Sequence, residues 1–84
     1  MSDMLNWKFK IVANNCAGAL TSVAAAFSNE NVNITKVTSD ETDLKGETVI
    51  WIDFESSVDE KDILVRKIKR LTKVNSISES LVSK

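Results

Sequence analysis

The spacing of the apolar residues changes twice along this chain from that of a strand to that of a helix, and this repeated change constrains the fold most. Apolar residues alternate over 7–12, and from residue 20 they recur every three or four positions. The same order returns over 47–55 and 57–71. A period of two is that of a strand with one buried face, and a period near 3.6 is that of a helix with one buried stripe. The sequence therefore predicts a strand–helix unit in each half of the chain.

Two further strands complete the predicted order βαββαβ. The strands are expected at 7–12, 33–39, 47–55 and 74–80. The polar segment 39–46 is predicted to be the hairpin connection between the middle two. Such a chain forms a ferredoxin-like α+β fold, in which a four-stranded antiparallel sheet carries both helices on one face. The whole chain, 1–84, is predicted as a single domain.

Local signals mark the ends of both helices. Asn14 and Asn15 are candidate N-caps of the first helix, and Asn29 can end it because asparagine tolerates the left-handed conformation. The apolar stripe of this helix is Leu20, Val23, Ala24 and Phe27. Ser57 followed by Glu60 is a capping box that begins the second helix. The stripe of the second helix is Leu64, Ile68 and Leu71.

The third strand has the clearest alternation, and the second strand interrupts its own. The residues of the third strand expected to face the helices are Thr48, Ile50, Ile52 and Phe54. In the second strand, Ile34 and Val37 stand an odd number of residues apart, so they cannot face the same side of a regular strand. A β-bulge between them is therefore expected.

The other face of the predicted sheet is left without a cover. Val12, Val49 and Trp51 point towards it, beside Lys8 and Lys10. Large aromatic residues are enriched in interface cores, and a chain of this length buries only about 60–65% of its unfolded surface by itself. Both observations favour a homodimer with Val12, Val49 and Trp51 in its interface. The alternative is that the segment 4–5 folds back over Trp51.

The composition argues against several classes of function. A net charge of −1 provides no basic face for nucleic acid, and no apolar run approaches the roughly 18 residues of a membrane span. The chain has no histidine and one cysteine, Cys16, so we expect no metal site, no cofactor and no catalytic residue. We expect Cys16 to be a passive thiol in a cytoplasmic protein. Asp59, Glu60 and Asp62 are interpreted as complementing the helix dipole rather than as metal ligands.

With this order established, three short segments together resemble the ACT domain, a small regulatory ligand-binding module. They are Asn15-Cys16-Ala17-Gly18-Ala19-Leu20, Asn31-Val32-Asn33-Ile34, and Val74 with Ile77. Within the family, the chain is most similar to the C-terminal ACT domain of the RelA/SpoT-type guanosine tetraphosphate synthetases and hydrolases. Trp7, the Asn33-Ile34 pair and residues 67–74 carry that similarity. The chain is then either a fragment of a longer GTP pyrophosphokinase-type enzyme or a free-standing ACT protein.

The resemblance implies regulation rather than catalysis. ACT domains commonly bind an amino acid at an interface between domains, and the matching positions here are Asn15, Gly18 and Asn33. The helix start suits the carboxylate of such a ligand, and the asparagine amides suit its ammonium. Two other interpretations stay open: Asn15 as a simple N-cap with Asn33 as a turn residue, and Gly18 as a point of tight packing. The alternative function is a structural dimerisation or docking domain that binds no small ligand.

Overall fold

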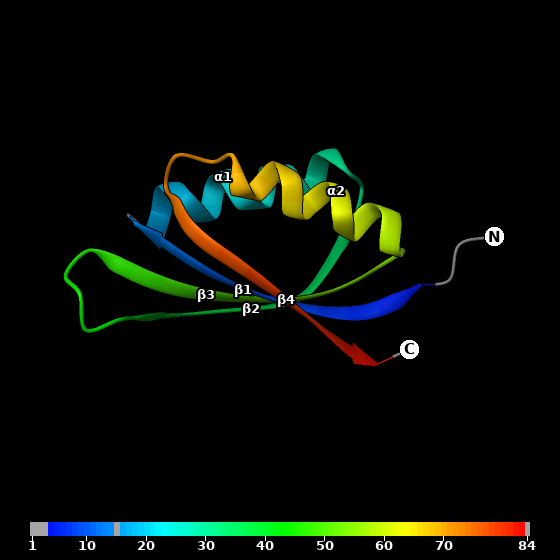
Figure 1. The fold of residues 1–84 in the computed structure, drawn as a ribbon, viewed down its shortest axis with the longest axis horizontal. Coiled ribbons are helices and arrows are strands. Elements are labelled where there is room, and N and C mark those ends of the chain that lie inside the picture. The colour runs from blue at the N-terminus through cyan, green and yellow to red at the C-terminus, as the bar shows by residue number, and fades with distance from the viewer. Residues whose placement is uncertain (1–3, 15, 84) are drawn as a thin grey trace.

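The strands form one antiparallel sheet, and both helices lie on the same face of it (Figure 1). The computed structural model describes residues 4–14 and 16–83. Its elements are β1 (Leu5–Asn14), α1 (Cys16–Asn29), β2 (Asn33–Glu41), β3 (Glu47–Ser56), α2 (Val58–Lys69) and β4 (Val74–Ser83). The strand order is β2-β3-β1-β4, and each neighbouring pair is antiparallel. The predicted ferredoxin-like α+β fold is confirmed.

The alternating residues of β1 and β3 form the centre of the core. The four β3 residues predicted to face the helices are all buried, and so are their β1 neighbours on the same face: Thr48, Ile50, Ile52 and Phe54, with Trp7, Phe9 and Ile11. Phe27 of α1 and Leu64 of α2 belong to the same buried cluster. Three phenylalanines meet edge to face, with ring centroids 4.6 Å apart for Phe9 and Phe54 and 5.0 Å apart for Phe27 and Phe54. Such pairs add about 0.5–1.5 kcal/mol each beyond the burial of area.

The bulge expected in β2 is present. Ile34 pairs with Phe54 and Val37 pairs with Ile52, and the register shifts between Ile34 and Lys36. In a regular strand Ile34 and Val37 would face opposite sides of the sheet. The extra residue of the bulge lets both face the same side, opposite core residues of β3.

All four strands continue beyond their predicted ends: β1 to Asn14, β2 to Glu41, β3 to Ser56 and β4 to Ser83. Each extension has a partner in a neighbouring strand: Asn14 pairs with Glu47, Ser56 with Leu5, Glu41 with Thr48 and Ser83 with Asn6. The connection between β2 and β3 shortens to 42–46, and Gly46 closes it with a φ of 83°, which favours glycine.

The ends and the stripe of α1 differ from the prediction. Asn14 is not the N-cap, because it is the last residue of β1 and its side chain bonds to β4. The helix ends at Asn29 as expected, but the left-handed residue is Asn31, with a φ of 60°. Ala24 is exposed, and Ala26 is buried instead. The buried stripe is therefore rotated slightly from the predicted one.

The predicted capping box begins α2. The Glu60 backbone N donates to Ser57 Oγ at 3.2 Å, and the Ser57 backbone N donates to Glu60 Oε1 at 3.0 Å. Leu64 and Ile68 are fully buried, as the stripe predicts. Leu71 lies beyond the end of the helix and is half-buried.

Candidate functional site

Two of the residues predicted to bind a ligand, Gly18 and Asn33, do not meet within one chain. Asn15 lies outside the described residues. Gly18 is in the first turn of α1, and Asn33 opens β2 beyond the other end of that helix. Because α1 has 14 residues, it separates these two ends by roughly 20 Å. An amino acid therefore cannot contact Gly18 and Asn33 of the same copy.

The Gly18 end of α1 is electropositive. Lys73, from the connection between α2 and β4, crosses this helix start: a Cβ on Gly18 would stand 3.1 Å from Lys73 Cδ and would collide with Lys73 Nζ. The backbone of Lys73 is held in place, since its carbonyl accepts from the Asn14 N–H at 2.8 Å. The first turn of α1 contains no acidic residue, and among the described residues no carboxylate pairs with Lys73. The lysine and the helix dipole together favour an anionic group here.

The Asn33 end carries the opposite charge. A hollow of about 270 Å³ at this end is lined by Met4, Asn31, Val32, Asn33, Glu55 and Glu60. Asn33 is exposed, and its neighbours Glu55 and Glu60 are carboxylates. None of the described residues in this lining has a basic side chain. An amide oxygen beside two carboxylates suits an ammonium group.

The open face of the sheet carries Val12, Val49 and Trp51, as the alternation predicts. Val12 and Val49 are cross-strand partners, and all three side chains are half-buried. The alternative cover for Trp51 is wrong, because Leu5 belongs to β1 and pairs with Ser56 of β3, and Met4 lines the hollow at the Asn33 end. The role of these three residues in a homodimer interface stays a prediction.

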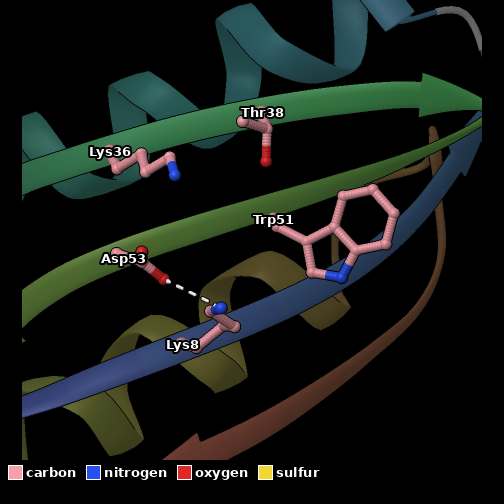
Figure 2. A pocket seen from close by; sticks show the side chains of 5 residues that line it. All are labelled: Lys8, Lys36, Thr38, Trp51 and Asp53. Carbon is pink, nitrogen blue, oxygen red and sulfur yellow. Dashed lines mark ion pairs between the residues drawn. The ribbon is translucent and has the colours of Figure 1, made fainter. Parts of the chain in front are cut away.

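Beside Trp51 the open face is hollowed (Figure 2). This Trp51 hollow, of about 210 Å³, is lined by Lys8, Lys36, Thr38, Trp51 and Asp53. Asp53 Oδ1 is shielded from water and has no hydrogen-bond partner. Lys8 Nζ stands 3.8 Å from it, which is longer than a hydrogen bond. The sequence does not reveal that this oxygen is buried, because the residues around it come from two other strands, β1 and β2.

Lys61 is a buried cation, with 7% of the residue exposed. Its Nζ donates to Asp62 Oδ1 and Glu79 Oε1, each at 2.6 Å, and lies 4.8 Å from the ring centroid of Trp7. Burial lowers the pKa of Lys61, but the hydrogen bonds and charges of Asp62 and Glu79 outweigh burial and hold the pKa above its ordinary value of 10.5. Lys61 thus joins α2 to β4, and its role is structural.

The described residues contain neither a metal site nor a membrane-spanning helix. No group of three histidine, cysteine, aspartate or glutamate side chains within 4–14 and 16–83 is placed to hold a metal ion. In the same ranges, no helix is both long enough and apolar enough to cross a membrane. The prediction for the Cys16 thiol concerns a side chain that lies outside what the structure describes.

Comparison with protein families gives one match that spans most of the chain. The model of the AHAS small subunit-like ACT domain matches residues 9–76. A comparison with curated proteins finds no significant match.

Solved structures with the same architecture include two complete small domains and one longer subunit. An uncharacterized protein from Thermotoga maritima has a TM-score of 0.77 at 14% identity, covering 96% of this chain and 100% of that protein. The ACT domain from a GTP pyrophosphokinase of Chlorobium tepidum has a TM-score of 0.75 at 16% identity, with 93% and 100% covered. The small subunit of acetolactate synthase from Thermotoga maritima has a TM-score of 0.76 at 18% identity, with 88% of this chain and 46% of that subunit covered. At these identities the likeness shows the fold alone.

Proposed function

This chain belongs to the AHAS small subunit-like ACT domains, and on that basis we propose that it is a regulatory module that binds a free amino acid between two copies of itself. The observation that carries the proposal is the opposite charge of the two ends of α1. Gly18 with Lys73 forms an end suited to a carboxylate, and Asn33 with Glu55 forms an end suited to an ammonium. A zwitterion needs both ends, and one chain cannot bring them together.

A two-fold axis beside β2 would bring the complementary ends together. β2 is an edge strand with β3 on one side only, and edge strands are ready surfaces for pairing. α1 lies over β1, β2 and β3, which includes the β2 edge, whereas α2 lies over β4 at the opposite edge. β2 begins at Asn33 and ends at Glu41, which pairs with Thr48 at the start of β3. Thr48 also pairs with Ala13 near the end of β1, and α1 begins just after β1. The end of β2 therefore lies near the start of α1. Antiparallel pairing of two β2 strands therefore sets the Asn33 end of each copy towards the Gly18 end of the other.

Ligand binding would then control the pairing. An amino acid that bridges two copies binds only the paired form, so it shifts the equilibrium towards pairing by its differential affinity. This shift is the regulatory signal that the module passes to the enzyme it serves.

The enzyme that is regulated is proposed from the named relatives. The family match favours acetolactate synthase, and the structural likeness to a GTP pyrophosphokinase domain supports control of guanosine tetraphosphate synthesis or hydrolysis as a second candidate. Adding the purified chain to each catalytic partner from the same organism, with and without amino acid, tests both candidates. A rate that depends on the chain and the amino acid together identifies the partner, and an unchanged rate excludes it.

The amino acid itself can be found by thermal denaturation against the twenty standard amino acids. A ligand at 100 times its dissociation constant adds about 2.7 kcal/mol of stability, which is easily measured in a small domain. Sedimentation velocity at tens of micromolar protein should show that the same amino acid promotes the dimer.

Asn33→Ala is the informative variant, and Asn6→Ala is its control. Asn33 is exposed, so its loss should leave the unliganded fold within about 0.5 kcal/mol of wild type while abolishing the ligand-induced shift. Asn6 is an amide at the same end of the sheet but on β1, away from the β2 edge, and its variant should bind normally. Normal binding by Asn33→Ala would contradict the proposed site. A dimer that responds to no amino acid would favour the structural alternative.

A further inference from the structure

We propose that the Trp51 hollow is a second ligand site, contained in a single copy of the chain, and that it binds a free α-amino acid with an apolar side chain. Its lining residues come from β1, β2 and β3 and face away from both helices (Figure 2). The site is therefore separate from the one proposed between two copies at the ends of α1. The hollow offers a carboxylate for the ammonium of a zwitterionic ligand, lysine and threonine groups for its carboxylate, and an indole for its side chain.

Asp53 binds the ammonium group of the ligand. Its Oδ1 is buried without a hydrogen-bond partner, and a buried acceptor in that state is costly. Lys8 covers this oxygen from 3.8 Å, and the Lys8 side chain is 47% exposed, so it can turn aside into solvent. The ligand's ammonium then donates to the Asp53 carboxylate at hydrogen-bond length.

Lys36 and Thr38, both on β2, bind the carboxylate of the ligand. In the register of the sheet, Asp53 lies between Lys8 of β1 and Lys36 of β2, and Thr38 pairs with Trp51 one row further along. Figure 2 shows Lys36 and Thr38 on one side of the hollow and Lys8 on the other. Among the described residues of the lining, two lysine ammonium groups stand against one carboxylate, so this part of the hollow has an excess positive charge that an anionic group neutralises.

Trp51 provides the apolar wall, and the size of the hollow limits the ligand. The indole is half-buried, and an aliphatic or aromatic side chain packs against it. A volume of about 210 Å³ is smaller than the roughly 300–1,000 Å³ of pockets that hold drug-sized molecules, so a single amino acid suits it. The neighbouring rows of the face carry Asp40 and Glu55, which would repel a nucleic acid strand that extended beyond the hollow.

Tryptophan fluorescence reports on this site, because Trp7 is buried at 7% exposure and Trp51 lines the hollow. L-leucine and L-phenylalanine are the probes. We expect a saturable change in Trp51 emission and calorimetric binding of one ligand per chain in the hollow. Leucinamide lacks the carboxylate and 4-methylpentanoate lacks the ammonium, so each should bind at least tenfold more weakly than leucine.

Variants separate this site from the one between copies. Asp53→Asn and Lys36→Gln should each weaken the fluorescence-detected binding at least tenfold, with thermal unfolding close to that of the wild type. Asp40→Asn is the matched control, because Asp40 lies on the same face of β2 outside the hollow. Asn33→Ala should leave the Trp51 signal unchanged even if it abolishes ligand-induced dimerisation, so the two proposals fail independently.

Three results would overturn the inference. The first is no Trp51 response to either probe, and the second is normal binding by Asp53→Asn. The third is a Trp51→Ala variant that associates more weakly than the unliganded wild type in sedimentation, because a second copy of the chain would then cover the hollow. That outcome would favour the homodimer interface expected for this face.

Discussion

Replacing Gly18 with alanine should strengthen the fold and weaken ligand binding at the same time. The new Cβ would stand 3.1 Å from Cδ and 3.2 Å from Cε of Lys73 and would collide with Nζ. These atoms are the outer part of an exposed, flexible side chain, so we expect Lys73 to move while the helix stays in place. The ammonium would then leave the start of α1.

The gain in stability can be estimated from helix propensity. Alanine is about 0.8–1.0 kcal/mol more favourable than glycine in a helix interior, and Gly18 lies in the first turn, where the gain is smaller. Moving Lys73 offsets part of it. A net gain of about 0.5 kcal/mol would raise the unfolding midpoint by roughly 2–4 °C in a domain of this size.

The loss in binding can be estimated from the contact that Lys73 makes. A hydrogen bond to a charged group contributes about 1.5–3 kcal/mol, so losing the lysine should weaken amino-acid binding by roughly tenfold or more. Urea denaturation and calorimetric titration measure the two effects separately. Lys73→Ala should weaken binding by the same factor, and adding Gly18→Ala to it should weaken binding no further.

Two outcomes would refute this reasoning. A loss of stability greater than about 1 kcal/mol in Gly18→Ala would show that Lys73 cannot move and that packing requires the glycine. Unchanged affinity in both single variants would show that the start of α1 does not hold the carboxylate.

The remaining predictions concern charged, capping and aromatic residues around the core. Lys61→Met keeps the stem against Trp7 but loses two ion pairs with partly exposed carboxylates, so we expect a loss of about 1 kcal/mol at pH 7. The pKa of Lys61 is raised in the folded state, so its ion pairs contribute fully to the free energy of unfolding below pH 10.5 and are lost as the pH rises through the raised pKa. Urea denaturation should therefore show the stabilities of the wild type and Lys61→Met converging in strong alkali. A difference in stability that stays constant with pH would contradict this. Ser57→Ala should cost about 1 kcal/mol in the same assay through loss of the cap, and no cost would mean that the capping box is not formed in solution. Trp51→Ala should cost the fold much less than the roughly 3–5 kcal/mol expected for Phe54→Ala, and equal costs would mean that β3 is turned over.

The spacing of the apolar residues, and whether they occupy odd or even positions along a strand, were sufficient to predict most of the fold. The alternation of β3 assigns its core residues correctly, because in a strand with one buried face either the odd or the even positions are buried. The mismatch between Ile34 and Val37 predicts the bulge in β2 for the same reason. These signals lie within single elements, so they can be recognised without knowledge of any partner.

Features that depend on distant residues could not be predicted in this way. Asn14 looks like a helix cap in the sequence, but its side chain bonds to Asn75, which pairing of β1 with β4 brings beside it. Lys73 crosses the start of α1 at Gly18, although the two residues are far apart in the sequence. The burial of one oxygen of Asp53 likewise arises from neighbouring strands. The charges of the candidate sites are therefore a product of the tertiary fold.

The claim that one amino acid bridges two copies of the chain can be tested most directly by mixing two inactive variants. Asn33→Ala removes the ammonium end, and Gly18→Glu places a carboxylate where the ligand's carboxylate should bind, while an acidic residue at a helix start is well tolerated. Each variant alone should show no ligand-induced dimerisation in calorimetry combined with sedimentation. In an equal mixture, half of the dimers are mixed and each contains one intact site, so about one quarter of the wild-type binding capacity should return. If the mixture stays inactive while each variant remains folded, the ligand does not bridge the Gly18 end of one copy and the Asn33 end of another.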